Sequence, residues 1–255
     1  MRTLFACLTV ALLAGCAAVP RPAREPTALL TAPPYDAWAR VLERHVDDRG
    51  RVDFAAVARD RADLDRFVAY IYDTGPNNAP RLFPSADHVL AFHLNAYNAL
   101  AMHQVIEWGI PVTLAGMRRV GFFLLGKVLV GGEAITLYEY ENTVIRALGD
   151  ARVHMALNCM SIGCPRLPRE PFLPATLNRQ LDREAERFFN DPRHVQLDHA
   201  ERKIRLSEIL KFYSEDFLAK EPSLAAYVNR YREVKVPENY AVDFIAYDWT
   251  INRQP

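Results

Sequence analysis

Apolar side chains recur along most of the chain at spacings of three and four residues, which is the repeat of an amphipathic helix. Between residues 35 and 46, Trp38, Val41, Leu42 and Val46 fall on one face of such a helix. The same spacing predicts helices over residues 57–72, 136–148 and 174–190, and further helices across 210–231.

The longest predicted helix spans residues 85–108. Ser85 can cap its start, and Gly109 followed by Pro111 stops it. Asn95 and Asn98 lie three positions apart on this mostly apolar helix and therefore share a flank. An unpaired buried amide costs ~1–3 kcal/mol. We therefore expect these asparagines to tie the helix to an irregular loop, or one of them to serve as an orienting or oxyanion-binding amide.

Shorter apolar runs predict strands. Residues 122–130 end at Gly131-Gly132, a pair typical of a hairpin turn, and residues 152–157 read as a short buried strand. Two more strand candidates cover residues 194–197 and 203–206, and an extended segment covers 242–249. The sequence therefore predicts an α+β fold, a helix-rich single domain with a small antiparallel sheet.

The first residues have a different pattern. A basic start and a short apolar run, too short to cross a bilayer, lead to Leu13-Ala14-Gly15-Cys16, which resembles the bacterial lipobox. The resemblance implies cleavage before Cys16 and lipidation of that residue, so residues 1–16 are the predicted signal peptide and lipobox. The segment 17–34 holds five prolines and is expected to be a flexible tether, and residues 35–255 form the predicted globular domain.

This N-terminus predicts an outer-membrane lipoprotein that faces the periplasm, because Ala17, and not an aspartate, follows the lipidated cysteine. Lys plus Arg and Asp plus Glu number 31 each, so the formal net charge is zero and nothing favours nucleic acid. The membrane contact is therefore expected to come from the lipid anchor at Cys16 alone. Motifs for nucleotides, dinucleotides, serine hydrolases and zinc proteases are absent, and no cofactor is expected.

Two of the four cysteines remain for chemistry once Cys7 leaves with the signal and Cys16 carries lipid. Cys159 and Cys164 lie in the run HMALNCMSIGCP, residues 154–165, together with His154 and Asn158. In an oxidising envelope the two thiols could pair as a stapling disulfide. The run could also supply ligands to a metal, although its spacing does not match common zinc patterns and no metal is predicted. The third alternative is a catalytic thiol beside the histidine.

For catalysis we predict Cys164 as the nucleophile, because it lies between a glycine and a proline in a turn, and Cys159 as a deeper, supporting residue. His154 would take the thiol proton, and Glu141 or an asparagine such as Asn95 would hold its ring. The reaction would be acyl transfer or amide hydrolysis on an envelope peptide or peptidoglycan. Arg146 lies five positions after Glu141, on another face of the helix, and is expected to bind a carboxylate or backbone carbonyls elsewhere.

Five separated blocks resemble the family called domain of unknown function 547: AFHLNAYNALAMH, ITLYEYENTVIR, DARVHMALNCMSIGCPRL, RLSEILKFYSEDF and YDWTIN. The resemblance carries no established activity. The positions that it implies as signature residues are Asn95, Tyr97, Asn98, Glu141, Arg146, His154, Asn158, Cys159, Ser161, Cys164 and Pro165. His93, Asn142 and Gly163 depart from the family's usual tryptophan, histidine and serine.

Two classes of function stay open from the sequence. One is a thiol-dependent hydrolase or acyl transferase, in which Asn98, Asn158, Cys159 and Arg146 support binding. The other is a non-enzymatic periplasmic binding or scaffold protein in which Cys159 and Cys164 form a structural disulfide.

Overall fold

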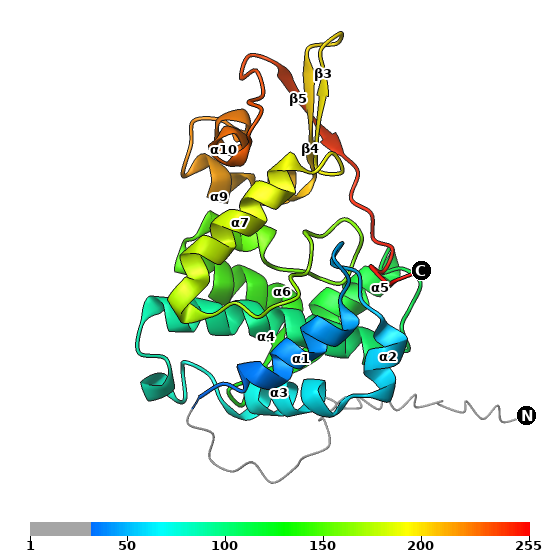
Figure 1. Ribbon diagram of the computed structural model, residues 1–255, viewed down its shortest axis with the longest axis vertical. Coiled ribbons are helices and arrows are strands. Elements are labelled where there is room, and N and C mark those ends of the chain that lie inside the picture. Colours follow the sequence, from blue (N-terminus) through cyan, green and yellow to red (C-terminus); the bar gives the residue numbers. More distant parts are fainter. Residues whose placement is uncertain (1–31) are drawn as a thin grey trace, which may run out of the picture.

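Two small sheets and a larger set of helices make up the structure, a computed structural model that describes residues 32–255 (Figure 1). The α-helices are α1 Tyr35–His45, α2 Phe54–Arg59, α3 Ala62–Asp73, α4 Ala86–Glu107, α5 Met117–Val120, α6 Leu137–Glu139, α7 Leu177–Asn190, α8 Ile209–Phe212, α9 Ser214–Leu218 and α10 Leu224–Tyr231. Short 3-10 or π turns cover Pro80–Leu82, Gly121–Leu125, Tyr140–Ile145, Arg146–Leu148, Ala151–Met155 and Pro174–Thr176. The predicted α+β class is confirmed. The predicted signal peptide, Cys16 and most of the tether lie outside the described residues.

The strands form one hairpin and one three-stranded sheet. β1 (Lys127–Val130) pairs with β2 (Glu133–Thr136), and both glycines of the turn have positive φ, 58° and 87°. That conformation suits a tight hairpin turn and favours glycine at both positions. β4 (Lys203–Ser207) lies between β3 (Val195–Asp198), which is antiparallel to it, and β5 (Ala241–Ile245), which is parallel. The second sheet is therefore mixed, whereas the sequence predicted antiparallel pairing.

Helix α4 is the centre of the larger hydrophobic core. It is apolar on all sides, and every residue from Leu90 to Ile106 is buried, as expected for a helix surrounded by other elements. The Ser85 side chain accepts a hydrogen bond from the backbone N–H of His88, which confirms the predicted cap. Helices α1 and α3, the hairpin and the segment around Ile145 pack around α4.

A second hydrophobic core lies under the three-stranded sheet, where α7 and α10 pack around Phe189 and Phe217. Figure 1 shows β3, β4 and β5 projecting from one end of the molecule, beyond α7 and α10. Met155 belongs to this core and Leu157 to the larger one. The chain just before the cysteines therefore joins the two cores, and this position places the cysteines near the boundary between them.

Several local predictions differ from the structure. Residues 57–72 belong to two helices, α2 and α3, and not one. Residues 152–157 were expected as a strand, but Ala151–Met155 forms a 3-10 helix, capped by the Asp150 side chain, which accepts from the Arg152 N–H. In the predicted strand 122–130 only β1 is extended, and Gly121–Leu125 is helical. Short apolar runs do not distinguish a buried strand from a buried helical turn, which explains these errors.

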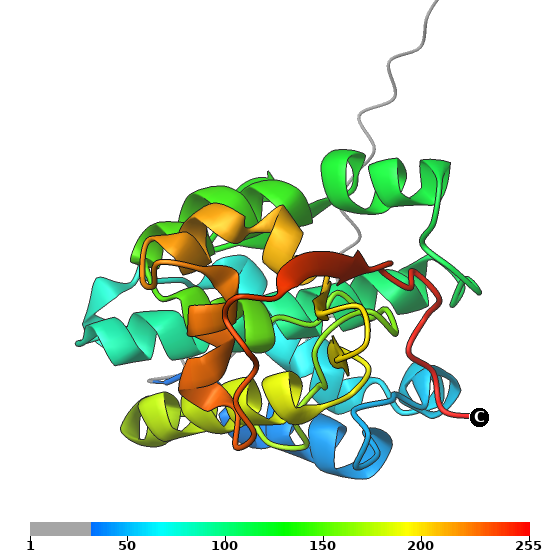
Figure 2. The same ribbon diagram turned by 90° about the horizontal axis from the view of Figure 1, so that it is seen from above.

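The last residues return to the larger core. After β5 the chain runs back along the molecule (Figure 1), and in the view from above its end lies beside the early, blue helices (Figure 2). The Val52 N–H donates to the Asn252 carbonyl at 2.9 Å. On the way the chain lies beside residues 112–114, because the Leu114 N–H donates to the Trp249 carbonyl at 2.9 Å. This C-terminal segment, residues 246–255, thus joins elements that are distant in sequence.

Candidate functional site

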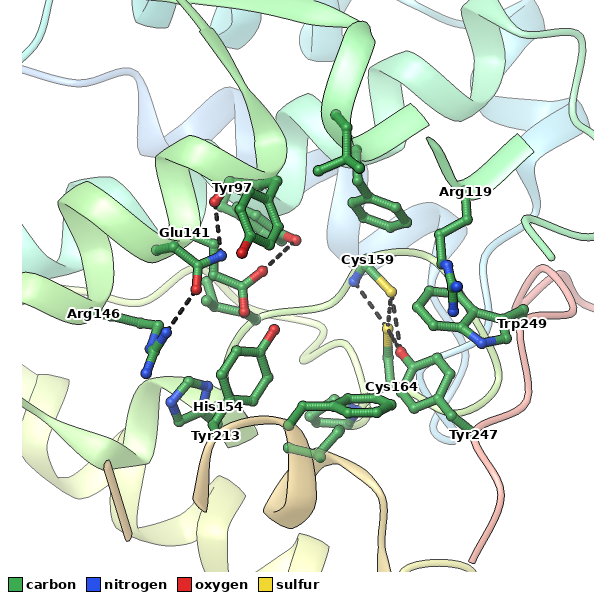
Figure 3. Close-up of a pocket in the computed structure, with 18 of the residues that line it drawn as sticks. Tyr97, Arg119, Glu141, Arg146, His154, Cys159, Cys164, Tyr213, Tyr247 and Trp249 are labelled. Carbon is green, nitrogen blue, oxygen red and sulfur yellow. Dashed lines mark hydrogen bonds between the residues drawn. The ribbon is translucent and has the colours of Figure 1, made fainter. Parts of the chain in front are cut away.

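A pocket with a volume of about 440 Å³ lies where both cores, the cysteine loop (residues 156–165) and the C-terminal segment meet (Figure 3). Aromatic and aliphatic side chains line much of it, and a smaller group of residues supplies polar atoms. The lining residues with polar side chains are Tyr97, Arg119, Tyr138, Glu141, Asn142, Arg146, His154, Cys159, Cys164, Tyr213, Tyr247 and Trp249. The sequence-predicted residues Glu141, Arg146, His154, Cys159 and Cys164 therefore line one cavity.

Two buried asparagines shape the cysteine loop. Asn98 of α4 accepts from the Asn158 N–H at 2.7 Å, and its amide donates to the Ala156 carbonyl at 3.0 Å. Asn158 in turn donates to the Pro165 carbonyl at 2.6 Å and accepts from the Met160 N–H at 2.7 Å. The loop has little regular structure of its own, so these bonds satisfy backbone groups that would otherwise be buried without partners. This agrees with the expectation that the α4 asparagines tie the helix to an irregular loop.

The C-terminal segment holds the other side of the loop. The Ile162 N–H donates to the Thr250 carbonyl at 2.7 Å, and the Gly163 N–H donates to the Asp248 carbonyl at 2.8 Å. A Cβ added at Gly163 would lie 2.8 Å from the Asp248 backbone nitrogen, so the close approach requires glycine there. The contact brings Tyr247 to the cysteines.

The two sulfur atoms lie 2.7 Å apart, and the Tyr247 hydroxyl lies 3.1 Å from Cys159 Sγ and 2.9 Å from Cys164 Sγ. Both thiols are free. Ser161 Oγ lies 3.3 Å from Cys159 Sγ, and the backbone N–H of Cys159 donates to Cys164 Sγ at 3.0 Å. Each sulfur therefore lies among hydrogen-bond donors.

The environments of the two thiols differ. Burial raises the pKa of the Cys159 thiol, but hydrogen bonds from Cys164, Ser161 and Tyr247 outweigh it and lower the pKa below its ordinary value. The pKa of Cys164 is raised well above its ordinary value by burial and by Cys159. Burial also raises the pKa of Tyr247, so its hydroxyl keeps a proton to donate. Cys159 is thus the sulfur that ionises first.

The predicted depths of the two cysteines are wrong. Cys164 is 4% exposed, whereas Cys159 is only partly buried. The reason is the turn at residues 161–163, which packs against the C-terminal segment and covers Cys164 instead of exposing it. Cys164 remains a predicted catalytic residue that the structure does not test.

Arg146, His154 and Tyr213 form a second polar group, which lies across the pocket from the sulfurs in the view of Figure 3. Asp216 of α9 accepts two hydrogen bonds from Arg146, at 2.8 and 2.9 Å, and its Oδ2 lies 2.7 Å from His154 Nε2. These contacts, with His154 first and Arg146 second, lower the pKa of Asp216, so it is a carboxylate. A carboxylate only accepts, so His154 Nε2 carries the proton that it donates. Tyr213 stacks on the imidazole with ring centroids 4.0 Å apart.

In the described part of the chain, no hydrogen bond joins Glu141 to His154. Its carboxyl accepts a hydrogen bond from Tyr97 at 2.9 Å, and Glu141 is also bonded to Tyr213, whose pKa is raised by burial first and Glu141 second. The residue that holds the imidazole is therefore Asp216, 62 positions away in sequence. His154 Nδ1 is buried and has no hydrogen-bond partner within residues 32–255. In that described part, no hydrogen bond joins His154 to a sulfur.

Of two other predicted site residues, Arg146 lines the pocket and Asn95 does not. Arg146 binds a carboxylate, Asp216, and not Glu141, as expected from its face of the helix. Asn95 does not line the pocket, because its side chain is bonded to the N–H and carbonyl of Phe172 at 2.9 and 2.7 Å. Its predicted role as an orienting or oxyanion-binding amide has no support from this position and remains a prediction.

Sequence reasoning did not identify Asp216, Tyr213 or Tyr247 as site residues. The available signal was that all three fall inside the blocks RLSEILKFYSEDF and YDWTIN, which carry the family resemblance. Within residues 32–255 no three His, Cys, Asp or Glu side chains are grouped so that they could hold a metal ion. In the same part of the chain no helix combines the length and the apolar character needed to cross a bilayer.

Comparisons with known proteins agree with the resemblance in part. No curated protein and no solved structure matches the chain. The model of one family, described as "Protein of unknown function, DUF547", matches residues 83–189, which include α4, the hairpin, the cysteine loop and nearly all of α7. The comparisons therefore support a match to the DUF547 family model over residues 83–189.

Proposed function

We propose that the pocket carries out thiol–disulfide exchange, with Cys159 as the attacking thiolate and Cys164 as the resolving thiol. The observation that carries this proposal is a pair of thiols that differ in exposure and in pKa, with their sulfur atoms 2.7 Å apart in the wall of a pocket. Cys159 is partly exposed and has a lowered pKa, and Cys164 is buried and has a raised pKa. Exchange requires a thiolate and a second thiol within reach, and it requires no general base in contact with the sulfur.

The reaction proceeds in two steps. The Cys159 thiolate attacks one sulfur of a substrate disulfide, the substrate S–S bond breaks, and the leaving thiolate takes a proton from solvent. The Cys164 thiol then gives its proton to solvent and its sulfur attacks Cys159 Sγ, so the mixed disulfide breaks, the Cys159–Cys164 disulfide forms and the second substrate thiolate is released. Two electrons pass from the protein to the substrate. The reverse sequence oxidises a substrate dithiol.

We further propose that the chain works as a lipoprotein of the outer membrane, anchored through Cys16 and facing the periplasm. The signal-like start and the Leu-Ala-Gly-Cys sequence support this location. An oxidising envelope is also where disulfides of other proteins persist and exchange. Phe123, Phe212 and Trp249 line the pocket, and Phe212 and Trp249 pack on Tyr247, which is bonded to the sulfurs. A peptide with an apolar side chain next to its cysteine is therefore the substrate class that fits.

One observation favours a second candidate, the thiol hydrolase or acyl transferase predicted from the sequence. His154 lines the same pocket, its Nε2 is held by Asp216, and its Nδ1 has no hydrogen-bond partner among the described residues. A base held by a carboxylate is the arrangement that activates a nucleophile in such enzymes. This candidate requires His154 Nδ1 to reach a cysteine sulfur, and its substrate would be an envelope peptide or peptidoglycan.

The experiment compares Cys159→Ser, Cys164→Ser and His154→Gln with the unchanged chain. With Ellman's reagent as the disulfide, Cys164→Ser is expected to form a stable mixed disulfide quickly, and Cys159→Ser to react at least about ten times more slowly, because the remaining thiol is buried and mostly protonated. His154→Gln should leave the exchange rate unchanged. Similar rates for the two serine variants would contradict the exchange proposal.

The same three variants test the second candidate with a thioester peptide as the substrate. Hydrolysis that depends on His154 and on one cysteine would replace the exchange proposal with the hydrolase. The redox state of Cys159 and Cys164 is also measured at different ratios of reduced to oxidised glutathione. If the two cysteines stay joined as a disulfide at every ratio, and neither assay shows a reaction, a structural disulfide in a binding protein would be favoured.

A further inference from the structure

A second cavity, with a volume of about 660 Å³, lies apart from the sulfur pocket. It is formed by the loop that follows α1, the last turns of α7 and the turn between α7 and β3. Its lining residues are Asp48, Arg49, Arg51, Arg166, Glu184, Arg187, Phe188, Asn190, Asp191, Arg193 and His194. No residue is common to the two cavities.

The charges around this cavity do not balance. Five arginines and three carboxylates line it, which leaves a formal surplus of two positive charges when His194 is neutral. The whole chain, by contrast, has a formal net charge of zero. The surplus is therefore a local feature of this cavity and not a consequence of overall composition.

Two of the three carboxylates are paired with arginines of the cavity, whereas the third, Asp48, is paired at 2.9 Å with Arg169, which does not line the cavity. Glu184, only 2% exposed, accepts from Arg187 at 2.9 Å and from Arg166 at 3.4 Å. Asp191 is paired with Arg193 at 2.7 Å. Neither Arg49 nor Arg51 has an ion-pair partner within residues 32–255. Their guanidinium groups are thus available to a ligand.

Buried donors at the same cavity also lack partners. His194 is 3% exposed and its Nε2 has no hydrogen-bond partner in the described part of the chain, and the same holds for the Nε of Arg166. Burial, with Arg193 second, lowers the pKa of His194 to about 4, so its ring is neutral at neutral pH and can donate one N–H. Buried polar groups in proteins are nearly always bonded, so unpaired donors at a cavity indicate a bound acceptor.

We propose that this cavity binds the phosphate group of a phosphorylated ligand through Arg49, Arg51 and the unpaired nitrogen donors of Arg166 and His194. Guanidinium groups match phosphate oxygens with two parallel hydrogen bonds, and the local positive surplus favours an anion. The cavity is much larger than a phosphate, so the group is expected to be an ester on a larger molecule. A soluble phosphate monoester and a phospholipid headgroup share this chemistry. The inference does not depend on the proposed thiol chemistry.

Calorimetric titration of the purified chain at low ionic strength tests the proposal. The probes are inorganic phosphate and dihexanoyl phosphatidylglycerol below its micelle concentration, with sodium chloride at matched ionic strength as the blank. The test variant is Arg49→Gln with Arg51→Gln, since neither side chain pairs with a carboxylate in the part of the chain that the structure describes. The matched control is Arg59→Gln with Arg179→Gln, because both residues are exposed and lie outside the cavity, and the change in net charge is the same.

Saturable binding of one probe, weakened at least tenfold by the test variant and unchanged by the control, is the expected result. Tighter binding of inorganic phosphate would identify a soluble monoester as the ligand class, and tighter binding of the lipid would identify a headgroup. No saturable binding of either probe, or equal weakening by both variants, would overturn the proposal. Thiol reactivity of the test variant should stay unchanged, which separates this result from the fate of the exchange proposal.

Discussion

Replacement of Asp216 by alanine is the most informative single perturbation of the sulfur pocket. Asp216 is the carboxylate on which His154 and Arg146 converge, and it joins α9 to segments that are 62 and 70 positions away. Its removal leaves the imidazole N–H and the guanidinium without that acceptor. We expect the Asp216→Ala variant to fold, to be less stable, and to retain the cysteine loop, because within the described residues no hydrogen bond joins residues 156–165 to Asp216.

The magnitude follows from the burial of the two partners. The His154 side chain is 0% exposed, and a hydrogen bond between a buried group and a charge contributes about 1.5–3 kcal/mol. The Arg146 and Asp216 side chains are 22% and 26% exposed, so solvent screens this pair and its contribution is about 1 kcal/mol. The free energy of unfolding of Asp216→Ala should therefore fall by about 3 kcal/mol.

The stability should also depend on pH in a defined direction. The hydrogen bonds from His154 and Arg146 hold the pKa of Asp216 below its usual value of ~3.9. The stabilisation is therefore complete above pH ~4 and is lost as the pH falls through the lower pKa of the folded state. The difference between the variant and the unchanged chain should shrink in that acidic range.

Urea unfolding followed by circular dichroism at pH 7 and at decreasing pH measures both effects. Glu215→Ala is the matched control, because Glu215 is the neighbouring exposed carboxylate on α9, and its change should stay within ~0.5 kcal/mol. If Asp216→Ala is no less stable than Glu215→Ala at pH 7, the reasoning about the Asp216 contacts is refuted.

Three further predictions concern residues of the cysteine loop and of α4. Gly163→Ala should lower the free energy of unfolding, measured in urea, by ~1–3 kcal/mol, because the new methyl group would lie 2.8 Å from the C-terminal segment. Gly75→Ala is the control and should be close to neutral, because the nearest atom to its new methyl group lies at 3.5 Å. Equal effects of the two substitutions would contradict this prediction. Asn98→Ala should lower the free energy of unfolding by about 2–3 kcal/mol, because two buried backbone groups lose their partner. It should also make the cysteines react faster with an alkylating reagent. Asn77→Ala, at an exposed position, is the control. Burial lowers the pKa of His93 to about 4. Between pH ~6.5 and 4 this histidine is therefore protonated in the unfolded chain but not in the folded one, so the free energy of unfolding should decline as the pH falls through that range. His93→Gln should flatten this part of the plot of the free energy of unfolding against pH. An unchanged slope in His93→Gln would exclude His93 as a source of the decline.

The sequence by itself determined the features that depend on neighbouring residues. Helix α4 and its Ser85 cap were predicted because apolar spacing and capping act within a few positions of each other. The glycine pair of the β1–β2 hairpin was predicted for the same reason, since the turn needs positive φ at two adjacent residues. The grouping of His154, Cys159 and Cys164 at one pocket also follows in large part from their positions within eleven residues of chain.

The tertiary structure alone decided which groups meet across long separations. Asp216 on His154 and Tyr247 on both sulfurs connect segments 62 to 88 positions apart, and no local pattern specifies such contacts. The greater exposure of Cys159 likewise depends on how the C-terminal segment covers the turn beside Cys164. The pKa values of the thiols depend on burial and on these distant donors, so the order in which the sulfurs ionise could be determined only after the chain is folded.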